Sequence, residues 1–314
     1  MPRKESIEFE NVEALGTLNV VASVALGAMT LALMLSVKMP SLMPEKPGII
    51  PLIRSPWFMI SLGVSLLISH IPLSIRSRQI SGELKRINES LMFLTDSLSV
   101  NLRTGMNFVE ALRRALDKVT SPVLRRRLSI LVSMMEGGED LATAIKRVTY
   151  GLPARAVEIL NTLIPASESG GRAARVISIA SDFSRRMNAF ERTKRSSLSP
   201  YFYISFMALA VFEGATLFLL YLTKSFQSLQ TGGESVIGSA MPAEEAWSLI
   251  YYMNMIIVIL SSLFVSKVVR GKIKYYSDYF LLFMLVHLLL LGIAPVYILL
   301  GGIGVPKVPF SGVP

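Results

Sequence analysis

The chain has 314 residues, of which 52% are hydrophobic, and it contains no cysteine. A water-soluble domain rarely carries this balance, so the composition favours an integral membrane protein. The absence of cysteine excludes disulfides, thiol catalysis and cysteine-based metal sites. The net charge of +10 is strongly basic, and the only histidines are His70 and His287. Two histidines are too few for a metal centre, and no phosphate-binding loop predicts a nucleotide cofactor.

Five stretches are long and apolar enough to cross a bilayer, which requires roughly 20 apolar residues. They cover residues 18–37, 57–75, 200–222, 249–269 and 279–300. Trp57 and Trp247 lie near span ends, where aromatic rings favour the membrane interface. The spacing predicts a membrane region with two spans (1–75), a soluble insert (76–199) and a second membrane region with three spans (200–314).

The charge of the short loops predicts the orientation of these spans. Arg270, Lys272 and Lys274 lie in the short turn after the fourth span, and basic residues favour the cytoplasmic side. Lys38, Lys46 and Arg54, in the proline-rich connector between the first two spans, argue mildly against it. The best fit places the N-terminus and residues 76–199 in the cytoplasm and the C-terminus outside.

The insert is predicted to be entirely helical. Apolar residues recur at helical spacing from Leu84 to Leu102, and again from Leu124 to Met135 after the helix start at Ser121-Pro122. Further runs predict about six helices and no strand. The expected fold is therefore all-α, with about five transmembrane helices and a cytoplasmic six-helix bundle.

Three glycines mark an internal repeat in the insert. Gly105, Gly138 and Gly171 are 33 residues apart, and each follows one amphipathic helix and opens another. This spacing predicts helical hairpins in which each glycine forms a left-handed cap. A tetratricopeptide array has a similar period, but its bulky Trp, Tyr and Pro positions are missing here.

Three segments resemble the F domain of the type II secretion system. The segments that begin at Leu102 and Gly137 resemble the two glycine-led segments of that domain, and the one that begins at Ala166 resembles its Glu-x-Gly signature. The resemblance covers roughly residues 80–222. Many members carry two copies of the domain, whereas this chain carries one, as in the tight-adherence and archaeal forms.

The resemblance implies a role without an active site or cofactor. Such platform proteins of secretion, type IV pilus and archaellum machines couple a hexameric cytoplasmic ATPase to pilin-like subunits. A single copy of the domain implies a homodimer or a pair with a paralogous platform subunit, surrounded by membrane lipids. We expect no enzymatic activity and no nucleic-acid partner.

Several surface motifs are candidates for these contacts. Glu168, Ser169, Gly170 and Gly171 form either a docking turn or an ordinary pair of helix caps. A cluster of arginines is a candidate for ATPase docking or, alternatively, a solvated helix face. Its members are Arg113, Arg114, Arg125, Arg126 and Arg127. Positive-inside anchoring fully explains Arg270, Lys272 and Lys274, and ATPase docking is an added hypothesis for them. Arg185 and its basic neighbours are expected to anchor the following span at the membrane surface.

Glu213 is an ionisable residue near the middle of the third span. Such a group costs roughly 2.5 kcal/mol or more at mid-bilayer, so it should face protein or water. It is either a contact for a pilin helix or partner subunit, or a structural residue paired with His287.

Three other functions remain as alternatives. A transporter or channel subunit would show polar residues facing inward across the spans, and these spans have few. A membrane enzyme would require clustered acids, histidines or nucleophiles, and none cluster here. A nucleic-acid-binding insert would show aromatic residues among its basic ones, and this insert does not.

Overall fold

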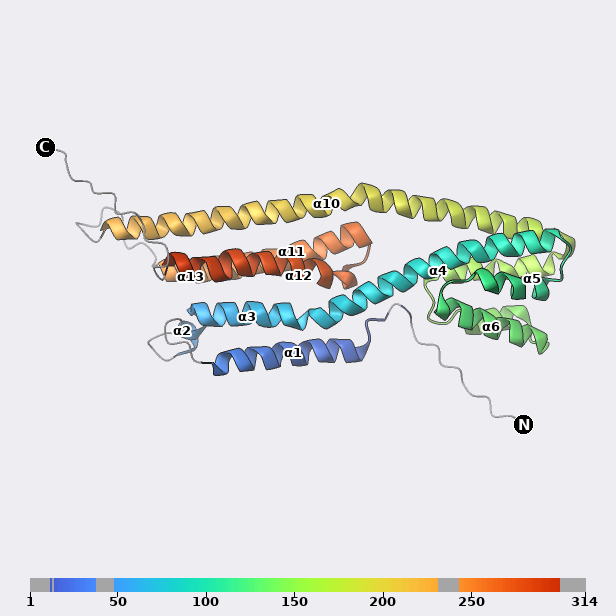
Figure 1. Cartoon of the computed structure of the whole chain (residues 1–314), viewed down its shortest axis with the longest axis horizontal. Helices are drawn as coiled ribbons and strands as arrows, with labels where there is room; N and C mark the ends of the chain where they lie inside the picture. Colours follow the sequence, from blue (N-terminus) through green and yellow to red (C-terminus); the bar gives the residue numbers. More distant parts are fainter. Residues whose placement is uncertain (1–11, 13, 38–47, 231–242, 300–314) are drawn as a thin grey trace. The chain divides into compact units, whose positions relative to one another are not determined.

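A computed structural model describes residues 12, 14–37, 48–230 and 243–299 (Figure 1). These residues form helices and turns with no strand, which confirms the expected all-α fold class. The chain divides into two compact units. Unit 1 comprises Met1–Gly16 and Arg76–Ser197, and unit 2 comprises Thr17–Ile75 and Leu198–Pro314.

Unit 2 holds the apolar helices, and within the described residues five are long and apolar enough to cross a membrane. This confirms the predicted number of spans. Its elements are α1 (Thr17–Ser36), α2 (Ile49–Arg54), α3 (Pro56–Ser69), α11 (Ala243–Arg270), η3 (Ile273–Tyr275), α12 (Ser277–His287), the π-helical segment η4 (Leu288–Ile293) and α13 (Ala294–Leu299), with the ends of α4 and α10. Much of the connector expected between the first two spans, residues 38–47, lies outside the described residues.

Close backbone approach holds α1 against α3, which run side by side (Figure 1). The hydroxyl of Ser65 donates to the carbonyl oxygen of Gly27 at 2.6 Å. A Cβ on Gly27 would lie 2.8 Å from Ser69, so only glycine permits this contact. Small residues commonly let transmembrane helices approach in this way.

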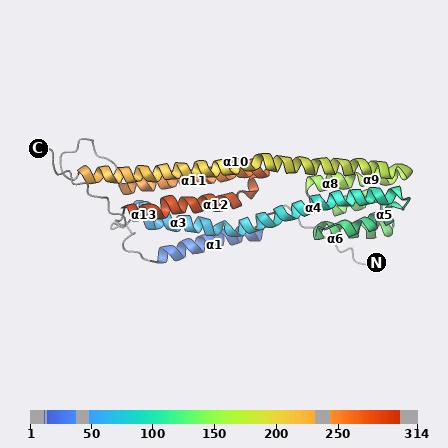
Figure 2. The ribbon, with the colours of Figure 1, turned by 45° about the horizontal axis from the view of Figure 1, so that its top comes forward.

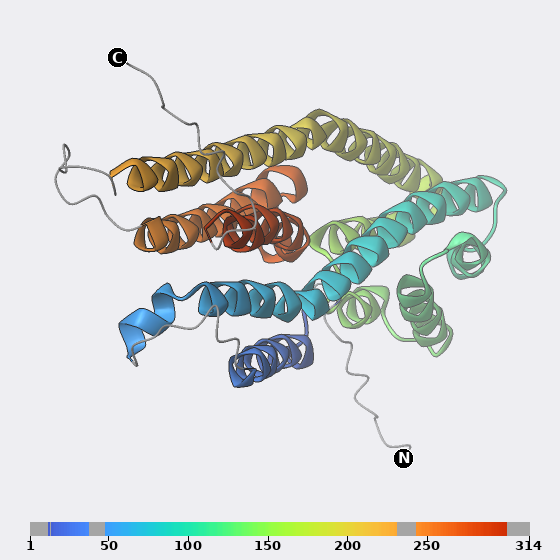
Figure 3. The same cartoon turned by 60° about the vertical axis from the view of Figure 1, so that its left-hand side comes forward.

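The two tryptophans, which lie near span ends, are buried inside unit 2. Trp57 donates its indole N–H to the carbonyl of Met34 at 3.0 Å, and Trp247 donates to Leu291 at 2.7 Å. A buried indole needs such a partner, because an unpaired N–H is costly in an apolar interior. Both rings therefore join helices, and Trp247 lies on α11, which packs against α12 (Figure 3).

Unit 1 is a bundle of amphipathic helices. Its elements are α4 (Ile71–Arg103), α5 (Phe108–Ala115), η1 (Leu116–Lys118), α6 (Pro122–Glu136), α7 (Leu141–Val148), α8 (Ala154–Asn161), α9 (Leu163–Glu168), η2 (Gly170–Arg172) and α10 (Ala173–Gln230), of which α4 and α10 continue into unit 2. Thr162 divides the stretch after Pro153 into α8 and α9. Both lie along α10 (Figure 2).

The core of unit 1 follows the predicted apolar spacing on most helices. Leu91, Leu94 and Leu98 of α4 are fully buried, as are Leu124 and Leu128 of α6. Burial of these stripes is the main force that orders helices of eight to fifteen residues, which are marginal in isolation.

The exception is α10, where the apolar residues at helical spacing do not all face the core. Ala180 is buried, but Phe183, Met187 and Phe190 are exposed, while Ile177 takes the core position. An apolar face of α10 is therefore left on the surface of unit 1.

Candidate functional site

Two of the predicted glycine turns have the same geometry. Gly105 and Gly138 adopt φ of 84° and 81°, in the left-handed region. In each turn the residue after the glycine donates its N–H to the carbonyl five positions back, at 3.4 and 3.0 Å. Asn107 and Asp140 then cap the next helix, each accepting a backbone N–H through its side chain, at 3.3 and 3.2 Å. These are Schellman turns followed directly by N-caps.

The third turn is different, and one detail of its prediction was wrong. The left-handed residue is Gly170, with φ of 53°, rather than Gly171. Glu168 ends α9, and the hydroxyl of Ser169 donates to the carbonyl of Pro165. The short helix η2 then leads into α10 without a side-chain cap. The glycine pair is therefore a tight connection between two nearly continuous helical segments.

Four of the predicted arginines form an exposed surface on α5 and α6. Arg113 pairs with Glu136, and Arg114 pairs with Glu110 at 3.0 Å. Arg125 lies 3.9 Å from Asp117, and Arg126 is exposed. Exposed pairs of this kind contribute little stability, so these side chains can exchange partners at low cost. Residues 76–199 carry 21 Lys and Arg against 12 Asp and Glu, so the surface keeps a positive excess.

Arg127 does not belong to this surface, which corrects the prediction for the run of three arginines. Only 3% of it is exposed, and its guanidinium donates to the carbonyl oxygens of Val148, at 3.1 Å, and of Tyr150. Burial lowers the pKa of this guanidinium from its ordinary value. Arg127 therefore ties α6 to the C-terminal end of α7 and is not available to a partner.

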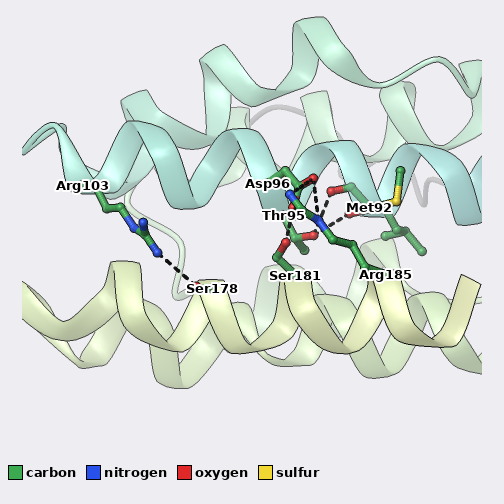
Figure 4. Close-up of polar contacts among 8 residues, drawn as sticks. Met92, Thr95, Asp96, Arg103, Ser178, Ser181 and Arg185 are labelled. Atoms are coloured by element: carbon green, nitrogen blue, oxygen red, sulfur yellow. Dashed lines mark hydrogen bonds and ion pairs between the residues drawn. The ribbon is translucent and has the colours of Figure 1, made fainter. Parts of the chain in front are cut away.

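A polar seam joins α4 to the N-terminal part of α10 (Figure 4). The carboxylate of Asp96 accepts hydrogen bonds from the hydroxyl of Ser181 and from the guanidinium of Arg185, the closest of the latter at 2.7 Å. This hydrogen bond and the charge of Asp96 raise the pKa of Arg185. One end of the seam is closed by Arg103, which donates to Ser178 at 3.1 Å.

Sequence reasoning missed this seam. Arg185 was expected to be a membrane anchor, but its partner lies 89 residues earlier in the chain, and no local pattern connects them. The only available signal was an aspartate inside an otherwise apolar stretch of α4.

The basic turn of unit 2 joins α11 to α12. Arg270 pairs with Asp278, which also accepts from the hydroxyl of Ser74, and its guanidinium lies 5.2 Å from the ring centroid of Tyr279. Arg270 therefore fixes the connection between α11 and α12. In the same turn, Lys272 is exposed, and the ammonium of Lys274 lies 5.1 Å from the centroid of the neighbouring tyrosine ring.

Glu213 and His287 lie together inside unit 2. Both are fully buried, and Oε1 of Glu213 lies 3.1 Å from Nδ1 of His287. The ring of Tyr251 packs against the imidazole, with centroids 4.5 Å apart. The π-helical segment η4 begins directly after His287. The pair joins α10 to α12, and no group of three or more potential metal ligands occurs within the described residues.

One comparison with known proteins gives a match. The family model described as type II secretion system (T2SS), protein F matches residues 94–221. The match runs from the middle of α4 through the glycine turns, the arginine surface and the polar seam into the apolar part of α10. No curated protein and no solved structure matched the chain.

Proposed function

Because residues 94–221 form a domain of the type II secretion system protein F family, we propose that this chain couples a cytoplasmic secretion ATPase to pilin-like subunits. Proteins of that family are membrane platforms of secretion and type IV pilus-like machines, and the five apolar helices agree with a multi-pass membrane protein. Beyond this family role, we propose that unit 1 binds the ATPase and that the apolar spans contact the pilin-like subunits.

The arginines on α5 and α6 support a docking role for unit 1. Four arginines are exposed on two adjacent helices, namely Arg113, Arg114, Arg125 and Arg126. The ion pairs that three of them form with nearby carboxylates are solvent-accessible. An acidic face of a partner can replace those weak pairs and gain from the excess positive charge. This surface is the observation that carries the proposal.

Two further features support the arrangement in the membrane. The basic turn at Arg270–Lys274 favours a cytoplasmic position by the positive-inside rule, which would place unit 1 on the same side. The apolar spans would then guide the pilin segment among membrane lipids. We propose no catalytic, metal or cofactor role for any residue, and no nucleic-acid partner.

The test uses the full chain in liposomes together with a secretion ATPase from the same organism. We expect the wild-type chain to bind the ATPase in a salt-sensitive manner and to change its rate of ATP hydrolysis several-fold. The variant Arg125→Glu/Arg126→Glu should abolish this change. A matched control is Lys146→Glu/Arg147→Glu, which reverses the same number of exposed charges on α7.

Two results would contradict the proposal. One is an unchanged hydrolysis rate with a folded chain and an active ATPase. The other is an equal loss in both double variants, which would show a general charge effect rather than a docking surface.

A further inference from the structure

Three polar side chains are buried on three helices of unit 2. Glu213 lies on α10, Asn254 on α11 and His287 on α12, and at most 3% of each is exposed. Oε1 of Glu213 and Nδ1 of His287 lie 3.1 Å apart. Within the described residues, three further atoms have no hydrogen-bond partner, namely Oε2 of Glu213, Oδ1 of Asn254 and Nε2 of His287. Buried polar atoms are nearly always paired, so these three atoms require a physical explanation.

The three side chains lie between two apolar clusters that draw on the same helices. The first cluster includes Leu209, Val258 and Met284. The second includes Leu220, Tyr251 and Leu291, of which the last lies in η4, directly after α12. On each helix the polar residue lies in the sequence between the two cluster members. The three residues therefore form one layer across the helices, which we call the polar layer.

Asn254 faces the interior of unit 2. It shares one face of α11 with Trp247, Tyr251 and Val258, which are all buried, because the four residues are spaced by four, three and four positions. The amide Nδ2 of Asn254 donates to the carbonyl of Ile250 at 2.9 Å. Oδ1 is therefore the end of this amide that lacks a partner, and it can only accept a hydrogen bond.

The donors and acceptors of the polar layer do not balance if Glu213 is ionised and His287 is neutral. Nδ1 of His287 must then carry the hydrogen that bonds Oε1 of Glu213, which leaves Nε2 as an acceptor. The three unpartnered atoms would all be acceptors, with no donor among them. The layer would also carry an uncompensated negative charge between two apolar clusters, which is costly.

One added proton removes both defects. On the carboxyl group it gives a neutral acid, and on the imidazole it gives an ion pair with no net charge. In either position it supplies one more donor, and Oδ1 of Asn254 is an acceptor in the same layer. Because Glu213 and His287 are in direct contact, the proton belongs to the pair rather than to one residue.

The neighbouring ionisable groups within the described residues have other partners or lie at another level. On α11, the hydroxyls of Tyr251 and Tyr252 donate to backbone carbonyls at 2.8 and 2.6 Å. On α12, Asp278 and Tyr279 lie at the opposite end of the helix from His287. Neither α3 nor η4 contains an ionisable residue. The charge of the polar layer is therefore set by Glu213 and His287 themselves.

We propose that the polar layer of Glu213, Asn254 and His287 is a proton-binding site that takes one proton from water. Release of the proton leaves a net negative charge between the two apolar clusters, which weakens the packing of α10 against α11 and α12. The site goes beyond the coupling role proposed above and does not depend on it.

Infrared and nitrogen NMR spectra of the full chain in lipid nanodiscs test the site directly. At neutral pH we expect either a carboxylic-acid carbonyl band that Glu213→Gln removes or an imidazolium signal that His287→Gln removes. The chain has only two histidines, so one variant assigns the signal of His287. A carboxylate at residue 213 together with a neutral imidazole at residue 287 in the wild-type chain would overturn the proposal.

Melting temperatures measured as the pH is raised give a second test. Loss of the proton should lower the melting temperature of the wild type, because a bare charge is then left in the apolar interior. Glu213→Gln is nearly isosteric and has no proton to lose, so its melting temperature should fall less over the same interval. Equal losses in the two chains would contradict the proposal.

Asn254→Leu tests whether the amide belongs to the site. Removal of this acceptor should shift the infrared band or NMR signal of the proton-bearing group toward that of a group without a hydrogen bond. Ser262→Ala is the matched control, because Ser262 is buried on the same helix and donates to the carbonyl of Ile259 at 2.7 Å. An unchanged signal in Asn254→Leu, or an equal shift in both variants, would overturn the three-residue site.

Discussion

At the scale of single residues, the pair formed by Glu213 and His287 shows how unit 2 accommodates ionisable groups. The two side chains are fully buried and meet at 3.1 Å between α10 and α12. Within the described residues, the second polar atom of each, Oε2 and Nε2, has no hydrogen-bond partner. The pair therefore depends on its single contact. If either side chain is removed, the other is left as a buried polar group without a partner, which is costly in an apolar interior.

We predict that the contact is worth about 1 kcal/mol, in the range of polar contacts between membrane helices. Glu213→Leu and His287→Leu should each lower the melting temperature of the full chain in detergent. The double variant should recover most of that loss, because it leaves neither partner unpaired. Glu213→Gln, which keeps a hydrogen-bonding group, is the matched control and should lose less.

Strictly additive losses in the two leucine variants would contradict the pairing. Filament or secretion output measured beside stability separates the two roles first considered for Glu213. A loss of output in Glu213→Gln at unchanged melting temperature would show a functional contact beyond the structural one.

At the scale of elements, the two Schellman turns are the best-defined parts of the repeat. Gly105 and Gly138 hold left-handed backbone, and a Cβ at either position would meet nothing within 4 Å. The cost of a side chain there is thus conformational rather than steric. It amounts to roughly 1–2 kcal/mol per residue.

We predict that Gly105→Ala and Gly138→Ala each destabilise the chain by about 1 kcal/mol and that the two effects add. Gly171→Ala is the matched control, since Gly171 lies outside the left-handed region and also has open space around it. Thermal melts of the full chain give the comparison. An effect of Gly171→Ala as large as the other two would contradict this account of the turns.

The apolar helices and most of the core could be predicted from the sequence because their signals are local. Hydropathy identifies a span within some 20 residues, and helical spacing identifies a buried stripe within two turns. Arg127 could also have been placed, since it shares the spacing of Leu124, Leu128 and Leu131, which are all buried. Composition alone placed it with the exposed arginines beside it.

The remaining features could not be predicted, because they depend on residues far apart in the chain. Asp96 and Arg185 are 89 positions apart, and neither lies in a distinctive motif. The exposed apolar residues of α10 could not be predicted for a related reason. The spacing of apolar residues does not determine which of two adjacent helix faces is buried in the core. Only the packing of α4, α8 and α9 around α10 decides this.

At the scale of the whole molecule, the charges of the short loops predict the orientation of the chain in the membrane. The exposed lysines Lys146 of unit 1 and Lys272 of the basic turn should lie on one side of the membrane. Glu234, in the loop between the third and fourth spans and outside the described residues, should lie on the other.

We predict that an impermeant maleimide added to intact cells labels Glu234→Cys but neither Lys146→Cys nor Lys272→Cys. Because the natural chain has no cysteine, the introduced cysteine is the only thiol that the maleimide can label in each variant. Permeabilised cells provide the control, in which all three should react. Labelling of Lys146→Cys from outside would reverse the orientation and place unit 1 away from any cytoplasmic ATPase.

The separation of Glu213 from His287 also has a consequence for biosynthesis. The two residues are 74 positions apart, so the ribosome delivers the third span before the histidine of the fifth has been made. During that interval α10 must enter the bilayer with a lone carboxyl group, at a translocon cost near 3 kcal/mol for a central acidic residue. The apolar residues around it must supply that insertion energy by themselves. The last span then supplies His287, and the carboxyl group of Glu213 gains its partner only at that point.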